Sequence, residues 1–168
     1  MPRLVDFRNA DFADIVGHMA FNDAGLSASA GAVTYATTAT VKYTIDGAFK
    51  SKTAASAQSL VTNSNEGYTA AQMVVPAATT AYFVVALNAA GDVKNFSNMS
   101  TVPGGSLIWP SSNSKVPKIP AGWCPIGIIK IVTGTTAFTP ATTFLDATTG
   151  GMVITYTNVS LLPLAESP

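Results

Sequence analysis

The sequence predicts an all-β protein, an antiparallel β-sandwich of jelly-roll type. Three observations support this class: apolar runs with strand spacing recur along the chain, Gly, Pro and Asn punctuate them, and helical spacing is almost absent. A chain of 168 residues suits one domain with its own hydrophobic core. We expect one β-sandwich domain over residues 33–168, preceded over residues 1–32 by an N-terminal arm or short helix.

Helical spacing occurs in one segment near the N-terminus. Between Asn9 and Met19 the apolar residues recur at intervals that place them near one face of a helix, and Asp11 and Asp14 would lie near its positive end. The expected apolar face comprises Phe12, Ile15, Val16 and Met19.

A first hairpin is predicted around Asp46-Gly47. Residues 41–45 alternate apolar and polar, and the dipeptide that follows is a frequent hairpin signature. A two-residue loop would place Phe49 opposite Thr44, whereas a three-residue loop over residues 46–48 pairs Ile45 with Phe49. We favour the three-residue loop, because a slip of one residue moves every side chain to the other face of the strand.

A second hairpin and two further strands are predicted from longer apolar runs. Residues 82–87 form a continuous β-branched and aromatic run, typical of a strand covered on both faces, and Gly91 closes a turn that leads into residues 93–96. Residues 126–132 form a third buried run. Residues 152–157 form a strand that Gly150-Gly151 precedes. Weaker strand candidates are Val33 to Thr40, Gln58 to Thr62 and Gln72 to Val75.

The segment from residue 97 to residue 125 departs from this rhythm. It is rich in proline, which cannot donate to a strand ladder, so we expect an extended loop laid over the sandwich. Both tryptophans, Trp109 and Trp123, lie in it. We consider two roles for them: capping the domain's own core, or forming subunit-interface or sugar contacts, with subunit contacts favoured over sugar. The prolines are Pro103, Pro110, Pro117, Pro120 and Pro125.

The charge content excludes several classes of function. Hydrophobic residues make up 48% of the chain and charged residues only 11%, with nine Lys+Arg balanced by nine Asp+Glu. This composition is unlike that of disordered chains, and no basic cluster is present to neutralise phosphates, so no nucleic-acid partner is expected. The most apolar windows are far shorter than the roughly 20 residues that span a bilayer. Since no export signal is visible either, we expect no membrane partner and a protein made in a cytoplasm.

The residues offer little for catalysis, so we expect a protein that is not an enzyme and has no cofactor or metal. His18 is the one base of the usual catalytic kind, and we expect a helix-terminal or partly buried imidazole. Cys124 is the only cysteine and is predicted to be a small buried hydrophobe. The N-terminal acids do not form a calcium loop, and we expect ordinary helix capping from them. These acids are Asp6, Asp11, Asp14 and Asp23.

Several segments together carry a resemblance to a known class. The run from Pro120 to Ile131, followed by residues 138–140 and 143–146, resembles a segment of tailed-bacteriophage virion structural proteins. Residues 43–49 and 82–93 are similar to hairpins of the same proteins, in the same order. These segments extend over about two thirds of the chain, from Val41 to Val159.

The resemblance implies a capsid decoration, or cement, protein with a jelly-roll fold and no catalytic residues. Such a protein sits on the outer surface of the icosahedral head, commonly as a homotrimer, so the implied partner is the major capsid protein and the implied location is the virion. Two other roles remain open: a tail or head-fibre component that binds a host receptor, and a monomeric carbohydrate-binding module. A low charge content suits permanent interfaces, because unpaired ions are costly to bury.

The N-terminal segment is the candidate capsid-contact arm. It precedes the first predicted strand by some margin, and we weigh an arm that reaches a neighbour equally with a disordered terminus. The candidate arm residues are Pro2, Arg3, Leu4, Val5, Asp6, Phe7 and Arg8.

Overall fold

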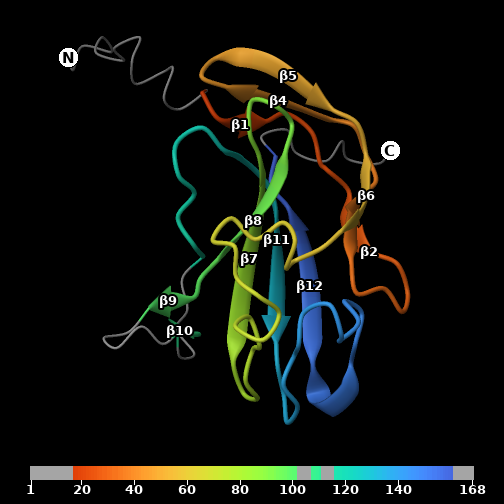
Figure 1. Cartoon of the computed structure of the whole chain (residues 1–168). Helices are drawn as coiled ribbons and strands as arrows, with labels where there is room; N and C mark the ends of the chain where they lie inside the picture. The colour runs from red at the N-terminus through yellow and green to blue at the C-terminus, as the bar shows by residue number, and fades with distance from the viewer. Residues whose placement is uncertain (1–16, 102–106, 111–115, 161–168) are drawn as a thin grey trace, which may run out of the picture.

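The computed structural model describes residues 17–101, 107–110 and 116–160. In these ranges almost all regular structure is β-strand, and neighbouring strands within the sheets run antiparallel (Figure 1). The predicted all-β antiparallel class is therefore confirmed, and the arrangement is compatible with a β-sandwich. The jelly-roll connection of the strands stays a prediction.

The largest sheet has four strands and stands upright in Figure 1, in the order β12-β11-β7-β8. It unites the three strongest strand predictions and the second hairpin, whose Gly91 has the predicted left-handed conformation, with φ of 83°. The turn before β12 is a 3-10 turn, η1 (Thr149–Gly151), in which both glycines also have positive φ. The strands are β7 (Thr80–Leu87), β8 (Val93–Ser97), β11 (Cys124–Val132) and β12 (Val153–Asn158).

Shorter strands form three further sheets. Two have three strands, in the orders β1-β4-β5 and β2-β3-β6, and one is the two-stranded ladder β10-β9. The β4–β5 hairpin crosses the upper end of the large sheet in Figure 1. The bounds are β1 (Met19–Ala20), β2 (Leu26–Ala28), β3 (Tyr35–Thr37), β4 (Val41–Ile45), β5 (Ala48–Lys52), β6 (Ala55–Gln58), β9 (Ser100–Thr101) and β10 (Leu107–Ile108).

One hydrophobic core lies against one face of the four-stranded sheet, which we call the inner face. Alternate residues of its strands point into this core, as strand geometry requires. Side chains from the smaller sheets and from the loops at residues 59–76 and 138–145 complete it. The largest fully buried side chains include Tyr35, Tyr43, Leu60, Met73, Phe83, Ile129, Ile131 and Phe138.

The register predicted for the first hairpin is wrong. Ile45 pairs with Ala48 and Thr44 with Phe49, so the loop is the two-residue Asp46-Gly47. Both loop residues have positive φ, 49° and 74°, which is the primed turn whose twist matches a two-residue hairpin. As a result Phe49 points outward and is 75% exposed.

The sheets begin before residue 33. Residues 17–32, expected within the arm, contribute β1, which pairs with β4, and β2, which pairs with β3. Met19 starts a strand instead of ending a helix, because its backbone pairs with Thr44. Gly17 and His18 form a bend, whereas residues 9–16 of the predicted helix and the candidate arm, residues 2–8, lie outside the described residues.

The proline-rich segment and the weaker strands follow the predictions in part. The segment includes the short ladder β9–β10, and its last residues, Cys124 and Pro125, already belong to β11. Pro125 is tolerated there because it pairs only with β7, next to a register shift, while β12 joins from Gly127 onward. Of the weaker candidates, residues 33–40 form only β3. The strand expected at residues 58–62 lies earlier, as β6, and residues 72–75 contribute only an isolated bridge from Val75 to Phe138.

Candidate functional site

The second face of the four-stranded sheet, which we call the outer face, is a candidate binding surface. The strand registers place three rows of side chains across β7, β11 and β12 on it. Eight of the nine residues are uncharged, and those of β12 are exposed. The rows are Thr80, Val132 and Val153; then Tyr82, Lys130 and Thr155; then Val84, Ile128 and Thr157.

Lys130 is the one charged side chain of these rows, and it lies against an aromatic ring. Its Nζ is 5.9 Å from the centroid of the Tyr82 ring, its cross-strand neighbour. A cation over the face of a tyrosine is attracted by the ring's quadrupole, at an exposed site by about 0.5–1 kcal/mol. The Tyr82 ring therefore partly accommodates the charge of Lys130, and the other side chains of the three rows are mainly neutral polar and β-branched.

The two candidate tryptophans lie on opposite sides of this sheet. Trp123 packs edge-on against Phe96 of β8, with ring centroids 5.3 Å apart, and Phe96 lies opposite the outer-face residue Val84. Trp109 packs against Phe83 of the inner face at 5.4 Å, and its Nε1 donates a hydrogen bond to the Val74 carbonyl at 2.8 Å. Both rings are half-buried within the chain's own packing. A subunit contact by either one stays a prediction.

An exposed aromatic side chain, Phe49, lies on the β4–β5 hairpin. Phe49 stacks on Phe21, with ring centroids 5.0 Å apart and an interplanar angle of 11°. The sequence did not indicate this pair, because the favoured three-residue loop would have turned Phe49 to the opposite face. A two-residue reading of Asp46-Gly47 was the signal that could have found it.

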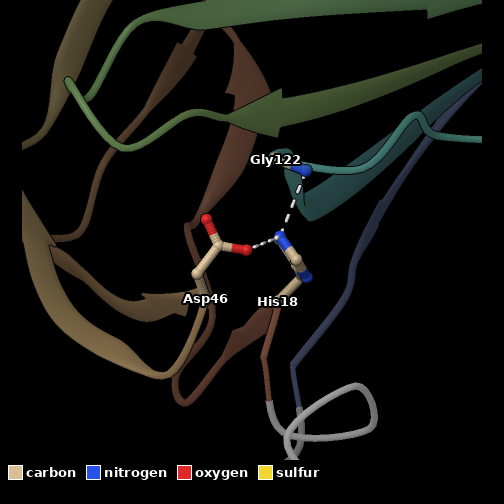
Figure 2. A network of polar contacts seen from close by, with 3 residues as sticks. All are labelled: His18, Asp46 and Gly122. Atoms are coloured by element: carbon tan, nitrogen blue, oxygen red, sulfur yellow. Dashed lines mark hydrogen bonds and ion pairs between the residues drawn. The ribbon is translucent and has the colours of Figure 1, made fainter. Parts of the chain in front are cut away.

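His18 joins three segments through one nitrogen atom (Figure 2). Its Nε2 lies 3.1 Å from the backbone nitrogen of Gly122 and 3.2 Å from Oδ1 of Asp46, whose side chain is 79% exposed. Beside it is a mostly apolar pocket of about 200 Å³. The imidazole is partly buried, as predicted, but it precedes a strand and ends no helix. The pocket is lined by His18, Met19, Ala20, Pro125, Val159 and Ser160.

Cys124 is fully buried at the start of β11, as predicted. Burial raises the pKa of its thiol from 9.0 to about 12, because the thiolate would lose its hydration. A thiol in this state is a poor nucleophile. Cys124 therefore acts as a small packing residue.

The acidic candidates do not assemble into a metal site within the described residues. No group of three or more His, Cys, Asp or Glu side chains gathers there. Asp23 accepts a hydrogen bond from the Ser160 hydroxyl. This bond connects the loop after β1 to the segment that follows β12. Asp6, Asp11 and Asp14 lie outside the described residues.

A buried polar network that the sequence did not indicate fixes the loop after β6. The Tyr35 hydroxyl donates to Oδ1 of Asn95, and Nδ2 of Asn95 donates to the Leu60 carbonyl at 2.9 Å. Burial raises the pKa of Tyr35, so the hydroxyl stays protonated and able to donate. Asparagine at a core-facing position of a predicted strand is the signal that could have revealed this network.

Comparisons of the chain with protein-family models, with curated proteins and with solved structures found no match. Among the described residues no helix is long and apolar enough to cross a membrane.

Proposed function

We propose that this protein is a non-enzymatic capsid decoration protein of a bacteriophage, which binds the outer surface of the icosahedral head and stabilises it. The observation that carries the proposal beyond the sequence resemblance is the outer face of the four-stranded sheet. Its three rows of side chains contain one charge, and three strands hold them in a fixed plane. A rigid surface of this kind loses little conformational entropy when a partner covers it.

The chemistry of the outer face suits a permanent contact. Burying an unpaired ion is costly, whereas Thr, Val and Ile side chains can be covered without that penalty. The exposed residues Val153, Thr155 and Thr157 lie on β12, at one edge of the sheet, where a neighbouring surface can reach them. In the proposed role the partner is the major capsid protein. The resemblance implies that a homotrimer is the bound unit, so that three modest contacts act together.

The experiment that tests this function is rebinding. Purified protein is mixed with heads of the encoding phage that lack it, and bound protein is measured by sedimentation together with the temperature at which the heads release DNA. We expect binding and a higher release temperature. Thr155→Glu and Thr157→Glu, which place charges on the outer face, should weaken both effects. Thr53→Glu, at an exposed position between β5 and β6, is the matched control.

The outcomes of this experiment distinguish between the possible roles, contact surfaces and oligomeric states. Wild-type protein that does not bind heads contradicts the decoration role, and binding to whole host cells instead would favour a fibre component. Wild-type protein that binds, together with outer-face variants that bind equally well, would keep the function but move the contact to another surface. A clean monomer at high concentration in light scattering would contradict the homotrimer.

A further inference from the structure

Nε2 of His18 contacts one hydrogen-bond donor and one hydrogen-bond acceptor, and these two partners require different protonation states of this nitrogen. Nε2 lies within hydrogen-bonding distance of the Gly122 amide, which can only donate, and of the Asp46 carboxylate, which can only accept when ionised (Figure 2). An imidazole nitrogen accepts when it carries no proton and donates when it carries one. Nε2 can therefore satisfy only one of these two partners at a time.

In the neutral imidazole the Gly122 contact is satisfied when the proton resides on Nδ1. The unprotonated Nε2 then accepts the Gly122 N–H at 3.1 Å. Asp46 gains no hydrogen bond in this state, and its carboxylate is largely exposed to water, which solvates it. The neutral form thus holds the turn at residues 121–122 that leads into β11.

In the protonated imidazolium the preference reverses. Nε2–H donates to Oδ1 of Asp46, and the positive charge favours the carboxylate. The Gly122 N–H then faces a donor and loses its acceptor. We propose that His18 is a proton-operated switch that holds the Gly122 turn when neutral and releases it toward Asp46 when protonated. This inference does not depend on the proposed function.

Asp46 is the one charged residue of the described chain that pairs with His18, and it comes from the β4–β5 turn. The pocket beside the imidazole is also lined by Met19, Ala20, Pro125, Val159 and Ser160, and none of these residues has an ionisable side chain that could form an ion pair with His18. Asp23, in the loop after β1, accepts a hydrogen bond from the hydroxyl of the pocket residue Ser160.

Of the two contacts of His18 Nε2, we expect only the one with Gly122 to determine how firmly a segment is held. The β4–β5 turn is tied to the segment of His18 by the Gly47 amide, which donates to the Gly17 carbonyl, and by the pairing of β1 with β4. These bonds do not involve the imidazole. The Gly122 turn is joined to Trp123, which covers Phe96 on the outer side of the sheet. Protonation of His18 therefore loosens the Trp123 cover and leaves the hairpin in place.

Amide hydrogen exchange tests the switch directly. Exchange of Gly122 is measured by NMR at a series of pH values between about 7.5 and 5. After correction for the intrinsic pH dependence, protection of Gly122 should fall roughly five- to tenfold on acidification, the size of one typical hydrogen bond. The Gly47 amide is the internal control, and its protection should not change.

His18→Gln supplies the matched variant. The glutamine Oε1 can accept the Gly122 N–H but does not titrate in this range, so protection of Gly122 should become independent of pH. Asp46→Asn should still show the loss, because protonation alone removes the acceptor. In a Trp109→Phe background, Trp123 emission should shift to longer wavelength on acidification, and His18→Gln should abolish that shift.

Two results would overturn the inference. One is unchanged Gly122 protection in the wild-type protein across the titration. The other is an equal loss of protection in wild type and His18→Gln, which would trace the change to another group. The wild-type titration stands on its own if a variant fails to fold, since Gly47 and Gly122 are compared within one molecule.

Discussion

The two faces of the four-stranded sheet are built from the same strands but have different environments. On the inner face Phe83, Ile129 and Ile131 are fully buried in the core. On the outer face Tyr82, Lys130 and Thr155, which alternate with core-facing residues along the same strands, are half-buried or exposed. The inner face therefore forms part of the core, whereas the outer face across β7, β11 and β12 carries mainly uncharged side chains, with Lys130 as the one charge of its three rows.

The contrast is weakest near β8, where the outer face is also covered. Val84 is only 2% exposed although it points away from the main core. It lies opposite Phe96, and Trp123 packs against Phe96. The residues before β11 therefore act as a partial lid on one half of the outer face, and the β12 half is left open.

The largest expected effect comes from the inner face. Phe83→Ala should destabilise the protein by about 3–5 kcal/mol, because it leaves a cavity in a closely packed core and removes the contact with Trp109. Urea unfolding followed by circular dichroism measures the change. Tyr82→Ala, the adjacent outer-face residue, is the control and should cost clearly less. Equal losses would contradict the distinction between the two faces.

The partial lid should give an intermediate effect. Trp123→Ala should cost about 2 kcal/mol, since it removes a half-buried ring and its edge-on contact with Phe96. The same unfolding measurement applies. Trp123→Phe, which keeps an aromatic ring, should recover part of the loss. A change near zero would mean that Trp123 does not cover the outer face in solution.

Alkaline pH should lower the stability of the protein in part through Cys124, which lies on the inner face. The pKa of Cys124 is raised by burial from 9.0 to about 12 in the folded protein. Its contribution is therefore complete below pH 9 and is lost as the pH rises toward 12, because only the unfolded chain releases the proton easily. Denaturation midpoints across this range should fall less for Cys124→Val than for wild type. An identical pH dependence in both proteins would contradict this contribution.

The smallest effect on stability is expected at the open half of the outer face. Thr155→Glu changes an exposed side chain that packs against nothing in the core, so stability should change by less than about 0.5 kcal/mol. Thermal unfolding measures it. A loss of several kcal/mol would show that the outer face is structural, and the proposed binding role would then lose its main support.

Strand identity was predictable where apolar runs were long. The run at residues 82–87 became part of β7, and the run at residues 126–132, interrupted only by Gly127 and Lys130, became part of β11. β-Branched apolar runs of this length are typical of buried strands. The short strands β1 and β2 were missed. Their backbones pair with distant β4 and β3, and a two- or three-residue strand has no period of its own to detect.

The sequence identified some residues of the candidate site but not the contacts between them. Trp123 and His18 were identified as residues to weigh, but their partners Phe96 and Gly122 are distant in sequence and come together only through sheet pairing. The Asp46-Gly47 turn shows the limit most clearly. Both loop lengths fit the sequence, and only the register of β4 against β5 in the structure shows that the loop has two residues.

The sequence by itself determined the fold class, the buried state of Cys124 and the low charge content of the chain, because hydrophobic period and composition are local properties. The tertiary structure decided which strands are neighbours, and therefore which residues share the outer face and which three segments meet at His18. These features depend on contacts between residues far apart in the chain. Strand pairing selects such contacts by burying one face of every strand at once.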